Sequence, residues 1–383
     1  MRIVFTMLLI TCAAATASAQ TTSASTEKPN PTLKERLQEP DQAGGLHLTE
    51  HFAVVFGGVK QGSGIALGPA LSEKFSDGSF LQLKGVYSIK KFKLLQARYD
   101  SRKFWSDRGI VISRLRWLNA PELSLYQLGP LSPNARADFG ERKTEGSSRI
   151  VLNPAGALRL AAGIGIERYS TNGGHIETKE GSGALPDVPP MPGLGTHPWF
   201  ARTFASAAYD TRLSPDYSRS GHFAEIVIHH YNDTHNNQDS FRRLEGTLQQ
   251  LVPTHGGRGV IDLSARTWLS FAEGDRSVPF FLMPTLGGGE MLRAFPSYRF
   301  RDRDALLLKG EYRWAVRKMA DVAGVYEAGK VGAEIENLGL RDVAHSFGIG
   351  IRVHSKTSSL FRADLAHGRE GFGFRIGFSA AGS

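Results

Sequence analysis

From His51 onward, apolar and polar side chains alternate along the chain with a period of two. The last segment shows the pattern clearly: Phe372, Phe374 and Ile376 fall on one face, and Gly373 and Arg375 on the other. Successive side chains of a β-strand point to opposite faces, so the pattern predicts strands with one apolar face. The alternating runs extend over roughly 8–12 residues, which is close to the length of a tilted membrane-spanning strand and longer than an average soluble strand.

The alternation predicts about sixteen such strands. They are expected at 52–59, 63–74, 79–90, 91–101, 108–118, 135–152, 155–170, 198–212, 221–233, 239–252, 258–273, 304–316, 319–332, 342–354, 358–367 and 370–379. An even number of antiparallel strands can close into a barrel without a free edge. We therefore expect an all-β transmembrane barrel over residues 51–383.

The connections between these strands differ in length in an ordered way. The long ones, 119–134, 171–197, 274–303 and 333–341, all fall on one side of the expected barrel, and short turns such as 254–257 and 355–357 fall on the other. Bacterial outer-membrane barrels have long outer loops and short periplasmic turns. The side with the long connections is therefore expected to face the cell exterior.

The N-terminal residues predict export. Residues 1–19 combine an early arginine, an apolar run and Ala17-Ser18-Ala19, as in a cleaved secretory signal. The single cysteine, Cys12, lies in this segment, so a mature chain has no thiol for a disulfide, a metal or catalysis. Residues 20–50 are polar and are expected to form a periplasmic tail. Beyond residue 19 no apolar run approaches the roughly 18 residues of a spanning helix.

The chain is basic, with a formal net charge of +9, a pI near 9.6 and a mean hydropathy of −0.24. Nucleic-acid binding is one interpretation of such a charge, but no nucleic-acid motif or basic helix is visible. For an exported protein, attraction to anionic outer-membrane lipid and lipopolysaccharide fits better. A barrel is also compatible with a modest hydropathy, because each strand alternates lipid-facing and lumen-facing residues.

The densest charge cluster follows the eleventh expected strand, in LGGGEMLRAFPSYRFRDRD, residues 286–304. A connection of this length is usually functional. On the next two strands, alternation points Glu311 and Glu327 into the lumen, and a buried carboxylate needs a partner. We expect an arginine of the loop to bond both walls, with Gly287, Gly288 and Gly289 permitting a tight re-entry of the backbone. A solvated surface loop is the alternative.

This loop resembles the signature loop of the BamA/TamA outer-membrane superfamily, also called bacterial surface antigen barrels. Leu292, Arg293, Ala294 and Phe295 match the Val-Arg-Gly-Phe/Tyr tetrad at the tip of the family's inward-folded loop. The resemblance implies that Arg293 meets acids on the following two strands, at the positions of Glu311 and Glu327. Here Ala294 replaces the family's glycine, and Glu327 replaces its aspartate. The resemblance extends over about residues 45–380, and we expect a member without POTRA domains.

The resemblance implies a role in outer-membrane biogenesis, by insertion or translocation of client outer-membrane or exported proteins, or of lipid, through a weak seam between the first and last strands. A passive porin-like channel or a structural barrel is the alternative. An enzyme is not expected, because no G-x-S-x-G nucleophile elbow is present. No cofactor is predicted. No metal site is predicted either, because the adjacent His229 and His230 point to opposite faces of a strand.

Overall fold

The structure is a computed structural model, and it describes residues 45–176, 191–235, 237–289, 291–339 and 341–378. One antiparallel sheet contains most of these residues. These residues belong to one unit, Leu33–Ser383. The residues expected as a signal segment, and the tail up to residue 44, lie outside the described part. Gly45–His47, from the end of the expected tail, forms a short strand, β1, against β2.

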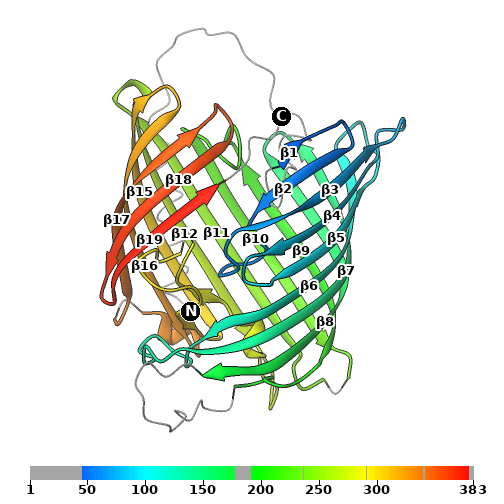
Figure 1. The fold of residues 1–383 in the computed structure, drawn as a ribbon, viewed down its shortest axis with the longest axis vertical. Coiled ribbons are helices and arrows are strands. Elements are labelled where there is room, and N and C mark those ends of the chain that lie inside the picture. The colour runs from blue at the N-terminus through cyan, green and yellow to red at the C-terminus, as the bar shows by residue number, and fades with distance from the viewer. Residues whose placement is uncertain (1–44, 177–190, 236, 290, 340, 379–383) are drawn as a thin grey trace. The chain divides into compact units, whose positions relative to one another are not determined.

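Sixteen strands of the described chain build the wall of the barrel (Figure 1). They are β2 (Phe52–Gly57), β3 (Ala66–Lys74), β4 (Phe80–Ser88), β5 (Lys93–Asp100), β6 (Gly109–Leu125), β7 (Ala137–Ala155), β8 (Leu158–Ile176), β9 (Trp199–Asp210), β10 (Gly221–Asp233), β11 (Phe241–Thr254), β12 (Gly259–Phe271), β15 (Asp304–Arg317), β16 (Ala320–Gly332), β17 (Ala344–His354), β18 (Ser359–Gly368) and β19 (Gly371–Phe378). The number and order of the expected strands are therefore confirmed.

Three strands are longer than the alternation predicts. β6 continues to Leu125 past a register shift after Ala120, β7 reaches Ala155, and β8 reaches Ile176. The expected ends at 118, 152 and 170 and the expected loop starts at 119 and 171 were wrong. Apolar and polar residues alternate only where one face of the strand lies against the apolar part of the membrane. Backbone hydrogen bonding between strands does not need an apolar face, so the strands continue past the alternating segment.

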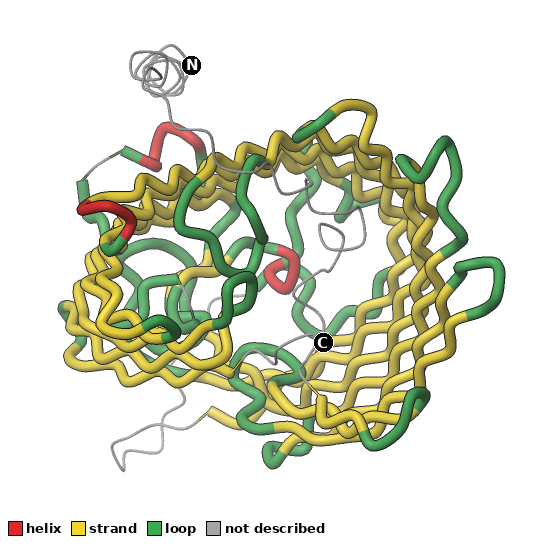
Figure 2. The backbone as a smooth tube through the Cα atoms, turned by 90° about the horizontal axis from the view of Figure 1, so that it is seen from above, coloured by secondary structure: helices red, strands yellow, loops and turns green. Residues whose placement is uncertain are grey.

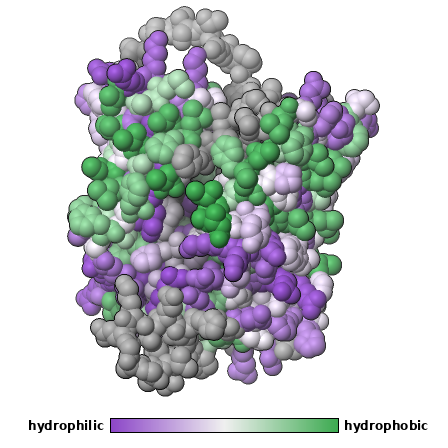
Figure 3. Space-filling view, in the orientation of Figure 1, coloured by the Kyte–Doolittle hydropathy of each residue, from purple (hydrophilic) through white to green (hydrophobic). Residues whose placement is uncertain are grey.

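The two faces of the wall differ as the period of two predicts. Ile349, Ile351 and Phe347 are exposed on the outer face of β17, and Ser346 and Arg352 are buried on the inner face. Exposed apolar side chains repeat in this way around the wall, and Figure 3 shows an apolar zone across the face in view. No helix among the described residues is long and apolar enough to span a membrane. The helical segments there are the short 3-10 turns η1 (His255–Gly257), η2 (Phe280–Leu282) and η3 (Ile335–Leu338).

The two ends of the barrel carry different connections. We call the end of the barrel at which β6, β8, β12 and β16 finish the loop end. We call the opposite end, with the short connections 75–79, 101–108, 156–157, 211–220, 255–258, 318–319 and 355–358, the turn end. In Figure 1 the loop end is at the bottom. Seen along the strands in Figure 2, connecting segments lie inside the ring of strands.

The sheet is open between its first and last wall strands. Residue pairs join every neighbouring pair from β2 through to β19, but in the described chain no register of paired residues joins β2 to β19. β1 pairs with β2 over three residue pairs, from Gly45↔Val55 to His47↔Ala53. The expectation of a closed sheet was therefore wrong. β2 and β19 are short and are flanked or interrupted by glycines, which favour strand pairing least.

Candidate functional site: a loop docked in the barrel lumen

The long connection between β12 and β15, residues 272–303, turns back into the lumen. It contains η2 and a pair of antiparallel strands of two residues each, β13 (Thr285–Leu286) and β14 (Phe300–Arg301). Gly287, Gly288 and Gly289 follow β13 with φ values of 110°, 75° and 57°, which side chains with a Cβ rarely adopt. The three glycines therefore permit the reversal that the sequence predicts. Glu290 lies outside the described residues.

Arg293, at the tip of the loop, is buried among three carboxylates. Its Nη1 lies 3.4 Å from Glu311 Oε2 and 3.3 Å from Asp364 Oδ1, and its Nε lies 3.5 Å from Glu327 Oε1. The backbone N–H of Arg293 also donates to Glu327 Oε2 at 2.7 Å. Arg293 is 2% exposed and Glu327 is 0% exposed. The structure thus brings together Arg293 with both glutamates named from the sequence.

Three wall residues that sequence reasoning did not connect to the loop, Asp364, Arg352 and Lys309, complete this cluster. Arg352 of β17 donates to Glu311 Oε2 at 3.1 Å and to Asp364 Oδ1 at 2.6 Å. Lys309 of β15 lies 3.4 Å from Glu311 Oε2. Arg313 Nε lies 3.9 Å from Glu311 Oε1. Four cations and three carboxylates therefore meet, and each ion has a partner of opposite sign. The alternation of apolar and polar residues does predict that Arg352 and Asp364 point into the lumen. No local feature of their strands, however, indicates that they lie next to the loop.

The apolar residues of the tip fill gaps in the wall. Leu292, with φ 57°, and Phe295 are fully buried, and Phe295 meets Phe300 edge-on at 5.1 Å. A Cβ added at Gly329 of β16 would lie 2.9 Å from Leu286 Cδ1 and 3.1 Å from Leu292 Cδ1. Glycine at this wall position is therefore needed for the loop to lie so close.

The tip also contacts the last strand. Arg375 of β19 donates to the Phe295 carbonyl at 2.5 Å, and the Ala294 N–H donates to Ser346 Oγ of β17 at 3.1 Å. A Cβ at Gly373 of β19 would collide with the Arg293 carbonyl oxygen and would lie 2.9 Å from the Ala294 Cα. β19, whose only ladder partner in the described chain is β18, is therefore held from the inside by the loop.

The same loop reaches the opposite side of the opening. Gln61, in the connection after β2, donates from Nε2 to the Gly287 carbonyl at 2.6 Å and accepts from Tyr298 Oη at its own carbonyl at 2.9 Å. Arg299 binds Glu370, in the β18–β19 turn, at 2.8 Å and Ser132 at 2.8 Å. Residues 272–303 thus contact the chain on both sides of the break between β2 and β19.

Burial changes the ionisation of the loop-end groups around this segment. Burial lowers the pKa of Arg301 to about 10, although Glu141 opposes the shift, and it raises the pKa of Tyr298. Burial also lowers the pKa of Lys60, whose Nζ lies 2.6 Å from Glu141 Oε1. These groups lie beside one buried apolar cluster, which includes Tyr298, Phe280, Phe139 and Phe200.

A second connection folds inward at the turn end. Tyr217, in residues 211–220, donates to Asp321 Oδ2 at 2.6 Å and stacks on the His354 ring at 3.9 Å. Arg219 Nη1 lies 3.0 Å from Asp321 Oδ2, and Arg313 donates to the Ser218 carbonyl at 2.7 Å. Burial, reinforced by Asp321, raises the pKa of Tyr217 to about 12. Sequence reasoning did not single out this segment.

The fold matches solved structures at low sequence identity. BamA from Haemophilus ducreyi lacking POTRA domains 1-3 is 12% identical, with a TM-score of 0.64, over 85% of this chain and 69% of that one. CdiB from Acinetobacter baumannii is 8% identical, with a TM-score of 0.54, over 86% of this chain and 59% of that one. CdiB from Escherichia coli is 12% identical, with a TM-score of 0.55, over 87% of this chain and 63% of that one. The chain thus spans 59–69% of these structures. No protein-family model and no curated protein matches it. The likeness confirms the barrel fold that the sequence resemblance implies.

Proposed function

We propose that this chain is a bacterial outer-membrane barrel that admits client polypeptides at the break between β2 and β19, for insertion into or passage through the membrane. One observation carries the proposal: the wall is open at this place, and a loop docked in the lumen contacts both sides of the opening. The likeness in fold to BamA and CdiB supports the same interpretation.

An open strand edge has a chemical consequence in a membrane. Backbone N–H and C=O groups that face hydrocarbon without partners cost several kcal/mol each. A client segment in an extended conformation can satisfy them by adding a strand to the edge of β19. On the other side, β1 already occupies part of the β2 edge through Val55, Val54 and Ala53. A client strand that pairs with β2 must therefore displace β1.

The docked loop argues against a wide passive channel. Arg293 joins the loop to the wall in the interior, and Phe280, Leu282 and Met283 pack into the loop-end cluster. A steady large conductance of the wild-type chain in planar bilayers is the result expected of a porin. We expect instead a low conductance that rises when Arg293 is replaced by methionine.

Cross-linking across the opening tests the proposal. Cysteines are introduced along β2 and β19, and the pair that oxidises is used to lock the wall. The matched control is Ile349→Cys with Leu365→Cys, two register partners on the paired strands β17 and β18. The assay measures how fast a urea-unfolded eight-stranded outer-membrane barrel folds into vesicles that contain this protein.

We expect the locked variant to lose the acceleration of client folding and to regain it on reduction, while the control pair retains it. An oxidised β2–β19 pair that accelerates client folding as well as the wild type does would contradict the proposal.

A further inference from the structure

Cationic side chains gather on the outer face of the wall near the loop end. Residue pairing places Lys93 of β5 opposite Asn119 of β6, and Asn119 opposite Arg142 of β7. Arg168 of β8 lies opposite Thr144, two residues along β7 from Arg142. Directly paired residues share a face of the sheet, and Lys93 shares its face with the exposed Leu95. Lys93, Arg142 and Arg168 are all exposed on the membrane side.

These three cations have no carboxylate partner among the described residues. Arg168 instead lies over the Trp199 ring, 5.3 Å from its centroid. Elsewhere such charges are matched: Arg242 lies 3.5 Å from Glu273, and Glu122, further along β6, lies 3.1 Å from Arg136. The β4–β5 turn adds the exposed Lys90 and Lys91 at the same end. The described part of this surface therefore carries unbalanced positive charge, and Figure 3 shows hydrophilic residues below the apolar zone on the face in view.

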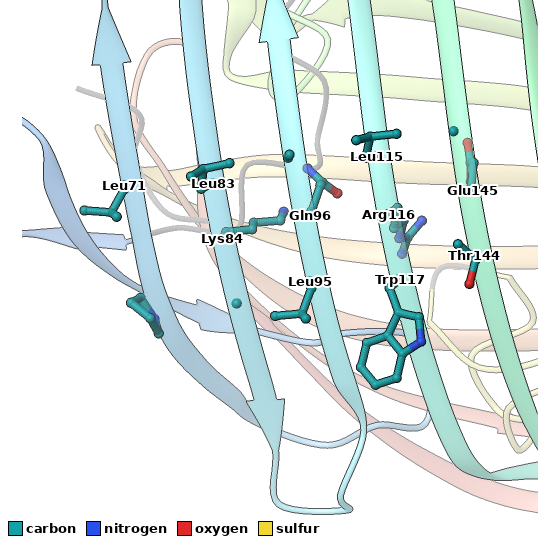
Figure 4. A pocket seen from close by; sticks show the side chains of 14 residues that line it. Leu71, Leu83, Lys84, Leu95, Gln96, Leu115, Arg116, Trp117, Thr144 and Glu145 are labelled. Atoms are coloured by element: carbon teal, nitrogen blue, oxygen red, sulfur yellow. The ribbon is translucent and has the colours of Figure 1, made fainter.

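A groove of about 640 Å³ lies next to these cations on the same outer face. Leu83, Leu95, Leu115 and Trp117 line its sides, and its floor lies over Gly85 and Gly146, where no side chain projects. Figure 4 shows Leu95 and Trp117 at the end of the groove nearest the β4–β5 turn, and the leucines on the near side of the strands. Lys93 is two residues beyond Leu95, about 7 Å along the strand.

We propose that this surface is a binding site for a phosphorylated, multiply acylated glycolipid of the outer leaflet. The groove accepts an acyl chain beside Leu115 and Trp117. The cations at its loop end bind phosphate groups of the headgroup. The apolar groove and the cations lie one after the other along the strands, as the acyl chain and the headgroup do in a lipid. Lys93 and Arg142 are separated by two strand spacings, about 10 Å, so that two phosphates of one headgroup can be bound together.

Charge complementarity favours this occupant over a second copy of the chain, because two copies joined through this face would bring the unpaired cations together. The inference rests on the proposed place in the outer membrane and does not involve the break between β2 and β19. The cross-linking experiment above and the binding experiment below can therefore fail separately.

The test measures lipid bound to the purified full chain in detergent by native mass spectrometry. The probes are bis-phosphorylated lipid A and, as the other source of lipid phosphate, phosphatidylglycerol. One variant combines Lys93→Gln, Arg142→Gln and Arg168→Gln. The matched control combines Arg102→Gln, Arg317→Gln and Lys318→Gln, which removes the same charge from the turn end. A third variant, Ala97→Phe, fills the groove without changing charge.

We expect the wild type and the control to bind lipid A in preference to phosphatidylglycerol. Removal of the three cations should weaken lipid A binding by about a hundredfold, and the filled groove should weaken it as well. Unchanged lipid A binding by the three-cation variant, or equal binding of the two lipids by the wild type, would overturn the proposal. A dimer of the wild type that Ala97→Phe dissociates would identify the face as a contact between copies and would overturn it too.

Discussion

Arg293 stabilises the docked loop through its shape as well as its charge. Its guanidinium contacts Glu311 and Asp364 with one nitrogen and faces Glu327 with another, while its backbone N–H binds Glu327. A lysine carries the same charge as a point, without the planar fork. We expect Arg293→Lys to keep the loop inside the lumen but to lower the temperature at which the barrel loses its compact, fast-migrating form in gel electrophoresis.

A double-mutant cycle on Arg293 and Glu311 measures the coupling directly. Each of Arg293→Met and Glu311→Gln leaves a buried ion without one partner and should lower the free energy of unfolding by about 3 kcal/mol. The double variant should cost less than the sum, by about 1–3 kcal/mol. Urea unfolding in lipid vesicles provides the values, with exposed Arg317→Met as control. Strictly additive costs would mean that the two side chains act independently.

Tyr217 provides a pH test at the turn end. Its pKa is raised from 10.0 to about 12, so the stability due to its neutral hydroxyl is complete below pH 10 and is lost as the pH rises toward 12. Tyr217→Phe removes the hydrogen bond to Asp321 and should cost about 1 kcal/mol at neutral pH. The stability difference between wild type and variant should shrink between pH 10 and pH 12 in urea titrations. A difference that stays constant over that range would show that this hydroxyl does not titrate as described.

At the scale of elements, close approach of loop and wall depends on glycine in β19. Gly373→Ala places a methyl group against the Arg293 carbonyl and Ala294, and should displace the loop tip and lower the unfolding temperature of the barrel. Gly324→Ala in β16 is the matched control, since a Cβ there meets nothing within 4 Å. Equal effects of the two substitutions would indicate that loss of glycine in a strand, and not the contact, causes the change.

Much of the element pattern can be predicted from the sequence, because alternation is a local signal. Glu311 and Glu327 could be oriented from their neighbours, and the family resemblance connected them to Arg293. Asp364 and Arg375 meet the loop residues Arg293 and Phe295, which are 71 and 80 positions away in the sequence. Arg352 reaches the cluster through Glu311, 41 positions away. These contacts form only after several strand pairings, which alternation does not specify. The inward turn with Tyr217 was missed because its partners Asp321 and His354 lie far away in the sequence.

At the scale of the whole molecule, an even number of strands did not predict closure. Closure depends on the backbone pairing of two particular edges, and β2 has six residues and β19 eight. The loop at residues 272–303 contacts Gln61 on one side of the opening and Glu370, Gly373 and Arg375 on the other. Movement of β19 away from β2 therefore requires these contacts to stretch or to break, which couples the lumen loop to the opening.

Hydrogen–deuterium exchange of β19 tests the open wall most directly. In lipid nanodiscs, a strand with a ladder on one side leaves about half of its amides without a partner, and a strand with ladders on both sides leaves none. We predict that about half the amides of residues 371–378 exchange fast, while those of β17, which pairs with β16 and β18, stay protected. Protection of every β19 amide at the level of β17 would mean a closed barrel and would contradict the account.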